Sequence, residues 1–319
     1  MSDLIVKLLT NLLQVAFLLF VSPLLEGLLK RLEEMVQGKH GPSIFQVYRD
    51  IWKLFHKDEV VSSQTTWIFR FAPVISFAMP VFVVLLIPEL TAFPLFFAFM
   101  GDMVAVGFLF ALSGFFTALA AIDTGNPYGP VGASRTRMIG FLAEPVFMAV
   151  FFAVSFVANA TIPYIVNSAW VVSWAAFLQP AHVLVIVAFL LLILADEGRI
   201  PVDSHAGKVE IAMIGHSRGL EYSGSGAALM KWAGAMKLMV LMIVFLNVLV
   251  TPWGLARDNS LVSVLIAMPL VMIKFLVFIV VLVAIEMSMA KLRLFRISEF
   301  LSAAFVICVF AMSVRLVGL

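Results

Sequence analysis

The chain has 319 residues, of which 63% are hydrophobic and only 13% are charged, and its mean hydropathy is +1.09. A soluble domain carries about a quarter charged residues and about half apolar ones, so this composition predicts a protein solvated by lipid. The formal net charge of +2 and the lack of a basic block argue against nucleic acid as a partner. A single cysteine, Cys308, excludes an intrachain disulfide framework and a cysteine-held metal site.

Eight apolar segments are long enough to cross a bilayer, which requires about 20 mostly apolar residues in a helix. In chain order the predicted spans are residues 3–25, 68–88, 95–121, 138–160, 179–196, 229–251, 260–286 and 297–318. Each span is expected to be helical, because lipid offers no partner to unpaired backbone groups and the alternation of barrel strands is absent. The expected fold class is an all-α integral membrane protein, with one polytopic domain covering residues 1–319.

The first connector contains a predicted amphipathic helix over residues 42–57. Its apolar face consists of Ile44, Val47, Tyr48, Ile51, Leu54 and Phe55. Its polar face consists of Arg49, Asp50, Lys53, His56 and Lys57. A helix with this pattern is expected to lie in the membrane interface rather than across the membrane.

Lysine and arginine are concentrated in the odd-numbered connectors. The second and fourth connectors carry none, and the sixth carries only Arg257. By the positive-inside rule the odd-numbered connectors face the cytoplasm, and both termini lie on the opposite side. The expected location is therefore the inner (cytoplasmic) membrane of the cell, as a multi-pass protein.

The fifth connector, residues 196–228, gathers charge in a chain that is otherwise apolar. Its ionisable residues are Asp196, Glu197, Arg199, Asp203, His205, Lys208, Glu210, His216, Arg218 and Glu221. A connector that only links two spans would not need so many charges of both signs interrupted by glycines. We interpret this segment as a docking surface that could also handle protons.

Several ionisable residues fall inside or near the predicted spans. Glu144 lies about seven residues into the fourth span, Lys237 at a similar depth in the sixth, and Lys274 near the middle of the seventh, while Asp102 and Glu286 lie near span ends. A charge in hydrocarbon costs at least about 2.5 kcal/mol, so it normally faces a partner, water or a function. These five residues are candidates for a buried polar path. A static ion pair or snorkelling is the alternative, favoured for Lys237 and Glu286, whereas a functional role is favoured for Glu144 and Lys274.

Motifs for other chemistry are absent from the sequence. It contains no glycine-rich phosphate cradle, no His-x-x-x-His or Cys-x-x-Cys pair and no Gly-x-Ser-x-Gly elbow. We therefore predict no catalytic residue, no metal site and no redox centre in this chain, although it could bind lipid.

Several segments together resemble one protein family. They are Lys39-His40-Gly41-Pro42 with residues 46–54, residues 67–73, Asp123-Thr124-Gly125-Asn126-Pro127 with residues 132–135, Glu144-Pro145, residues 199–203, and Glu221-Tyr222-Ser223-Gly224-Ser225-Gly226. Over essentially its whole length the chain resembles the respiratory complex I subunit 1 family. The segments 123–127 and 221–226 point to the branch found in formate hydrogenlyase and hydrogenase-4-type membrane-bound [NiFe]-hydrogenases.

The resemblance implies eight spans, with the cytoplasmic connectors forming the surface on which a soluble, metal-bearing arm docks. The [NiFe] centre and the iron–sulfur clusters would belong to partners: the large and small hydrogenase subunits and an iron–sulfur protein. Antiporter-like membrane subunits would complete the complex. The expected docking interface is Arg49, Asp50, Lys53, Arg135, Arg199, Asp203, Glu210, Glu221 and Tyr222.

One departure from the family bears on the reaction. Quinone-reducing relatives place several glutamates, spaced two apart, after the motif at residues 199–203, whereas the positions here are Ala206, Lys208 and Glu210. This favours an anchor and coupling subunit of a hydrogenase-type complex over the alternative, the quinone-site subunit of an NADH:quinone oxidoreductase. A free-standing transporter ranks third, because no internal repeat stands out. A fourth interpretation is that the buried charges only fix helix packing.

Overall fold

The computed structural model describes residues 2–98, 101–172, 177–202, 219–293 and 296–317. In chain order its helices are α1 (Ser2–Val36), α2 (Gln46–Phe55), α3 (Trp67–Leu86), α4 (Met103–Asp123), α5 (Tyr128–Ala158), α6 (Pro163–Val172), α8 (Pro180–Asp196), α9 (Gly224–Ile243), the π-helix η4 (Val244–Val250), α10 (Leu261–Ser288) and α11 (Ile297–Val317). The β pairing of these described ranges is limited to one isolated bridge, between Thr91 and Ala256.

Seven of the described helices are long and apolar enough to cross a membrane: α1, α3, α4, α5, α9 with η4, α10 and α11. The eighth apolar helix, α8, has 17 residues. At 1.5 Å per residue it is about 25 Å long, close to the shortest length that spans a bilayer. The prediction of an all-α integral membrane protein is confirmed.

Several helix boundaries differ from the predicted spans. The third span was predicted from residue 95, but α4 begins only at Met103, after the Oδ1 of Asp102 caps it by accepting a hydrogen bond from the Val104 N–H at 3.1 Å. Conversely, α5 begins at Tyr128 instead of residue 138, so that Arg135 lies within a helix and not in a connector. Hydropathy marks where the chain becomes apolar, whereas caps and prolines decide where a helix begins.

Two further helices also differ from the predicted boundaries. Helix α1 continues through Pro23 to Val36, well past the predicted end of the first span at residue 25. The interfacial helix is shorter than the predicted 42–57 and covers Gln46–Phe55. Its amphipathic pattern is nevertheless realised, because Val47 and Ile51 are buried.

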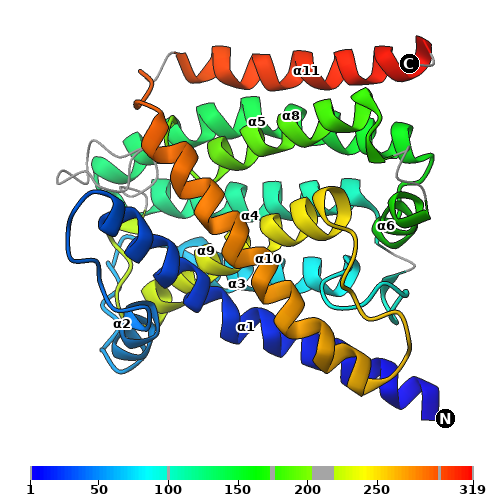
Figure 1. Ribbon diagram of the computed structural model, residues 1–319. Helices are drawn as coiled ribbons and strands as arrows, with labels where there is room; N and C mark the ends of the chain where they lie inside the picture. Colours follow the sequence, from blue (N-terminus) through cyan, green and yellow to red (C-terminus); the bar gives the residue numbers. More distant parts are fainter. Residues whose placement is uncertain (1, 99–100, 173–176, 203–218, 294–295, 318–319) are drawn as a thin grey trace.

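The helices form a bundle whose two ends differ (Figure 1). Both termini lie at one end, together with α6, and we call this the terminal end. Helix α2 lies at the opposite end, the α2 end. Helix α11 packs on α8 and α5, α3 packs on α4 and α9, and α1 packs on α9 and α10.

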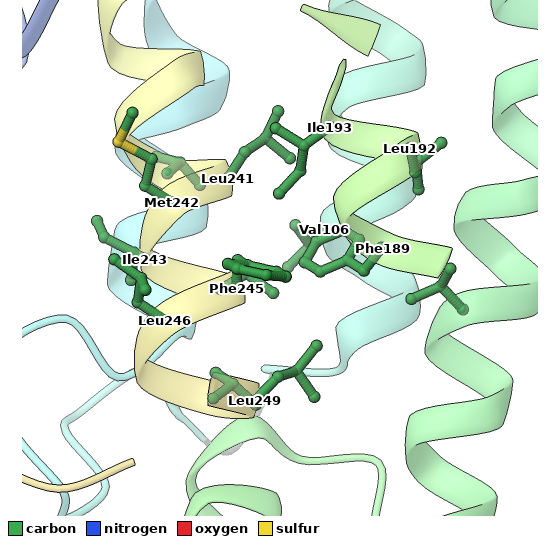
Figure 2. Close-up of a cluster of buried hydrophobic side chains, with 14 of the residues drawn as sticks. Val106, Phe189, Leu192, Ile193, Leu241, Met242, Ile243, Phe245, Leu246 and Leu249 are labelled. Carbon is green, nitrogen blue, oxygen red and sulfur yellow. The ribbon is translucent and has the colours of Figure 1, made fainter. Parts of the chain in front are cut away.

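The centre of the bundle is the continuous helix formed by α9 and η4, most of whose side chains are buried. Figure 2 shows Phe189 of α8 facing Phe245 of η4, and their ring centroids are 6.0 Å apart. Outward side chains of α10 and α11 are apolar and exposed, such as Ile266 and Phe310. Because lipid tails are as apolar as these side chains, close packing rather than hydrophobic burial holds such helices together.

Candidate docking surface and buried charge pairs

Helix α2 is fixed to the bundle by polar contacts as well as by its apolar face. The Asp50 carboxylate accepts hydrogen bonds from Lys231 Nζ of α9 at 2.5 Å and from Gln46 Nε2 at 2.8 Å. Although partial burial acts to raise it, the pKa of Asp50 is lowered below its ordinary value by the hydrogen bond and charge of Lys231. Asp50 therefore anchors α2, whereas the side chains of Arg49 and Lys53 are exposed.

The rest of the first connector contacts the start of α9. Ser223 exchanges two hydrogen bonds with the backbone of Val60, at 2.8 and 3.0 Å. The Ser225 hydroxyl donates to Glu59 Oε2 at 2.7 Å. Between these two serines, Gly224 has a φ of +52° and lies directly against the backbone of residues 57–59. Two segments more than 160 residues apart in sequence thus form one ordered surface.

The turn between α4 and α5 joins the same surface. Asp123 Oδ2 accepts hydrogen bonds from the backbone N–H and the hydroxyl of Thr66, at 2.7 and 2.9 Å. Asn126 donates to the Glu221 carboxylate. Tyr222 stacks on Phe69 with ring centroids 4.2 Å apart and donates its hydroxyl to the Phe69 carbonyl at 3.0 Å. We call the surface made of α2 and residues 58–66, 123–127 and 219–226 the connector platform.

Gly224→Ala is expected to destabilise this platform by about 2 kcal/mol, because a left-handed φ costs an L-residue roughly 1–2 kcal/mol. The added Cβ would also lie 2.9 Å from the Lys57 carbonyl oxygen and 3.0 Å from that of Asp58. Faster tryptic cleavage after Lys57 and a lower melting temperature in detergent would show the effect. The matched control is Gly234→Ala, whose Cβ meets open space within α9. If Gly224→Ala and Gly234→Ala destabilise the protein equally, the left-handed φ and the close contacts of Gly224 are not what stabilises the platform.

A buried charge cluster lies beneath the α2 end of the bundle. Arg199 Nη1 donates to Glu33 Oε1 of α1 at 2.5 Å and to Glu286 Oε1 of α10 at 3.1 Å. Arg199 and Glu286 are only 5% and 4% exposed, so Arg199 joins the ends of α1, α8 and α10 rather than facing a partner. The backbone N–H of Leu292 also donates to the Pro201 carbonyl at 2.7 Å, which ties the seventh connector to the fifth.

Lys237 of α9 forms ion pairs with two carboxyl groups at the end of α8. Its Nζ lies 2.7 Å from Asp196 Oδ2 and 4.0 Å from Glu197 Oε1. Burial raises the pKa of Glu197 from the ordinary 4.5 to about 7, although the charge of Lys237 opposes the shift. A carboxyl group with this pKa can gain or lose a proton near neutral pH.

The two residues for which a functional role was favoured lie in separate local networks. Glu144 Oε1 of α5 is 3.2 Å from Arg137 Nη1 of the same helix, and both side chains are about a third exposed, at 36% and 35%. Lys274 Nζ of α10 donates instead to Asn247 Oδ1 at 3.0 Å and to the Thr251 carbonyl at 2.7 Å, both at the η4 end of the central helix. Glu144 therefore lies nearer the bundle surface than predicted.

The remaining predicted residues divide into three cases. Arg135 is half-buried within α5, and Asp102 caps α4 near the terminal end. Asp203 and Glu210 lie outside the described residues. Among the residues that are described, no group of three or more His, Cys, Asp or Glu side chains is placed to hold a metal ion.

Three carboxyl groups with little exposure were not predicted from the sequence: Glu89, which is fully buried, and Glu33 and Glu197, whose side chains are 16% and 12% exposed. Glu33 and Glu197 resemble ordinary connector residues when spans are drawn by hydropathy alone. Glu89 directly follows the second predicted span, residues 68–88, and is not among the candidate residues. Its apolar neighbours, Ile87 and Leu90, are the signal that could have identified it.

The chain was compared with known proteins. The family model described as NADH dehydrogenase matches residues 9–317. Formate hydrogenlyase subunit 4 of Escherichia coli K12 is 31% identical over 285 residues, which cover 89% of this chain and 90% of that protein. Hydrogenase-4 component C of the same organism is 30% identical over 314 residues, covering 96% and 95%. An NADH-quinone oxidoreductase subunit of Carboxydothermus hydrogenoformans is 28% identical over 237 residues, covering 69% and 63%.

The fold has a close counterpart among solved structures. A chain from the structure of the membrane-bound sulfane sulfur reductase, an archaeal respiratory membrane complex, superposes with a TM-score of 0.82 at 18% identity, covering 96% of this chain and 98% of that one. The family model thus matches nearly the whole chain, and two relatives are at least 30% identical over most of it. The chain belongs to the NADH dehydrogenase family of membrane proteins, of the complex I subunit 1 type.

Proposed function

We propose that the chain is the membrane anchor and coupling subunit of a multisubunit membrane-bound hydrogenase or formate hydrogenlyase-like complex. The observation that carries this proposal is the similarity, over 89% and 96% of the chain, to formate hydrogenlyase subunit 4 and hydrogenase-4 component C. The connector platform supports it, because three connectors and α2 form an ordered polar surface at one end of an otherwise apolar bundle. The basic residues of the odd-numbered connectors favour the cytoplasmic side of the inner membrane for this surface.

The proposed partners are the large and small [NiFe]-hydrogenase subunits and an iron–sulfur protein on the platform, with antiporter-like subunits beside the bundle. Arg49, Lys53 and the 70% exposed Trp52 are the side chains that α2 presents to a docked protein. Exposed arginine and tryptophan are enriched where protein interfaces form. The [NiFe] centre and the iron–sulfur clusters would belong to these partners.

Affinity purification of the tagged chain from membranes in mild detergent tests the proposal. Nickel, iron and hydrogenase-type subunits are expected in the eluate in fixed proportion to the tagged chain. Recovery of the chain alone, stable and monodisperse, would overturn the proposal.

The second candidate function is the quinone-site subunit of an NADH:quinone oxidoreductase. It is favoured by the similarity to the NADH-quinone oxidoreductase subunit of Carboxydothermus hydrogenoformans, which is limited to 69% of the chain. Inhibition of the purified complex by quinone analogues, together with an NADH-oxidising flavoprotein in the eluate, would support this candidate. Hydrogen turnover that is insensitive to such analogues is the result expected from the hydrogenase-type function.

Lys274→Met is expected to reduce ion movement per hydrogen turned over by about 100-fold, the scale on which positioned proton-transfer groups act. The complex should still assemble, because methionine fills a similar volume. Proteoliposomes with a pH-sensitive or sodium-sensitive dye report the movement, and hydrogen turnover is measured in parallel. Lys39→Met, at an exposed connector position, is the control. If Lys274→Met and Glu144→Gln both leave the coupling ratio unchanged, the buried charges serve helix packing alone.

A further inference from the structure

The described residues include one carboxyl group that is fully buried without any partner. Glu89, in the connector between α3 and α4, is 0% exposed, and neither of its carboxyl oxygens has a hydrogen-bond partner. Burial raises the pKa of Glu89 well above its ordinary value. A buried, unpaired carboxylate is so unfavourable that the group takes up a proton instead. Such a group is rarely retained for stability alone.

The surroundings of Glu89 are polar and incompletely satisfied. Gln14 Nε2 of α1 donates to Thr91 Oγ1 at 3.4 Å, while its Oε1 has no partner. Asn11 lies one helical turn before Gln14, and neither the nitrogen nor the oxygen of its side-chain amide has a hydrogen-bond partner. Tyr164 of α6 donates to the Ile87 carbonyl at 3.2 Å. Unpaired donors and acceptors in one buried region are the condition under which an internal water is held.

Asn247 connects this region to Lys274. Its Nδ2 donates to the backbone carbonyl of Glu89 at 2.8 Å, and its Oδ1 accepts a hydrogen bond from Lys274 Nζ at 3.0 Å. Asn247 lies in the π-helical turn η4, and such turns occur frequently at functional sites. A single side chain therefore contacts both the segment that carries Glu89 and the lysine in the membrane.

We propose that Glu89 is a reversible proton-binding site at the terminal end of the bundle, and that Lys274 exchanges a proton with it. In the exchange the Lys274 ammonium loses a proton and becomes a neutral amine, while the Glu89 carboxylate gains it and becomes a neutral acid. The net charge of the region stays the same, and Asn247 with an internal water would bridge the two groups. The proposal concerns the end opposite the connector platform, so it does not depend on which soluble arm docks there.

Other titratable side chains lie near this site besides Lys274 of α10. Tyr164 of α6 and His182 of α8 are buried. His182 Nε2 forms a hydrogen bond with the Leu249 carbonyl oxygen at 3.1 Å. Arg257 and Asp258 are exposed and follow Ala256, whose backbone is hydrogen-bonded to Leu90 and Ala92. Helix α1 contributes the neutral amides of Asn11 and Gln14 and also the half-buried Lys7, one turn before Asn11, and η4 contributes the amide of Asn247. Asp102, in the same connector as Glu89, caps α4.

Infrared spectroscopy of the purified complex tests the site directly. At neutral pH the wild-type complex should show the carbonyl-stretching band of a protonated carboxyl group, and Glu89→Gln should lose it. Glu89→Asp should shift this band without removing it, so the test holds even if Glu89→Gln assembles poorly. The matched control is Glu286→Gln: Glu286 is 4% exposed but paired with Arg199 at 3.1 Å, so its loss should remove a carboxylate band instead.

Two results would overturn the proposal. If Glu89→Gln removes a carboxylate band, Glu89 is ionised and does not store a proton. If sodium abolishes the protonated band at constant pH, the site binds sodium rather than a proton. The role of Lys274 is measured separately. Lys274→Met should slow hydrogen–deuterium exchange of the Glu89 carboxyl group, followed by its infrared band, at least tenfold. An unchanged exchange rate would remove Lys274 from the proposal.

Discussion

Replacement of Arg199 by methionine is expected to destabilise the protein by about 3–5 kcal/mol, the cost of removing one partner from a buried ion pair. Arg199 holds the Glu33 and Glu286 carboxylates at 2.5 and 3.1 Å, and both would remain in a site from which water is largely excluded. Methionine fills the volume of the arginine stem but supplies no charge and no donor. A fall in melting temperature and in the yield of folded protein is the expected result.

Replacing the Glu33 and Glu286 carboxylates with neutral amides distinguishes the effect of unpaired charge from the effect of lost packing. The triple variant Arg199→Met, Glu33→Gln, Glu286→Gln should recover most of the lost stability, because no uncompensated charge then remains. Thermal unfolding in detergent, followed by tryptophan fluorescence, compares the single variant, the triple variant and the wild type. Equal melting temperatures for the single and triple variants would show that Arg199 stabilises the bundle by packing alone.

Reversing the charge of two exposed residues of α2 is expected to release the soluble arm. Arg49→Glu combined with Lys53→Glu should weaken its binding by about 100-fold or more, since like-charge contacts across an interface cost several kcal/mol. The helix should stay in place, because buried Val47 and Ile51 and the 2.5 Å pair between Asp50 and Lys231 hold it. The bundle itself should therefore fold normally.

The amount of co-purified soluble subunit per tagged chain, determined by quantitative mass spectrometry, measures this release. Arg257→Glu is the control, because Arg257 is exposed in the sixth connector, and this connector joins η4 to α10 at the terminal end of the bundle (Figure 1). It should leave the soluble arm bound. Retention of the arm by the double variant, or its loss from the control, would contradict the assignment of the docking surface to α2.

The spans could be predicted because lipid imposes a simple length and composition requirement on any helix that crosses it. The helix ends could not, since they depend on local capping. Asp102 delays the start of α4, while residues 128–137 extend α5 beyond its apolar part. The π-helical turn around Asn247 leaves no pattern in the sequence, because it arises from packing in the bundle.

The candidate site was predicted only in part. The segments 123–127 and 221–226 were singled out by resemblance, and the structure joins them through Asn126 and Glu221. Arg199 was assigned to the docking interface but is buried, because its partners Glu33 and Glu286 come from positions 166 and 87 residues away. No periodicity encodes such pairs. Hydropathy indicates that a buried charge needs a partner but not which residue supplies it.

A density map of the native complex, purified through this chain, is the most direct test of the assembly. We expect a folded soluble subunit that covers Arg49 and Lys53 and contacts the turn at residues 123–127, with the terminal end free of it. A map in which the connector platform faces bulk solvent while the soluble subunits attach elsewhere would contradict docking on this platform.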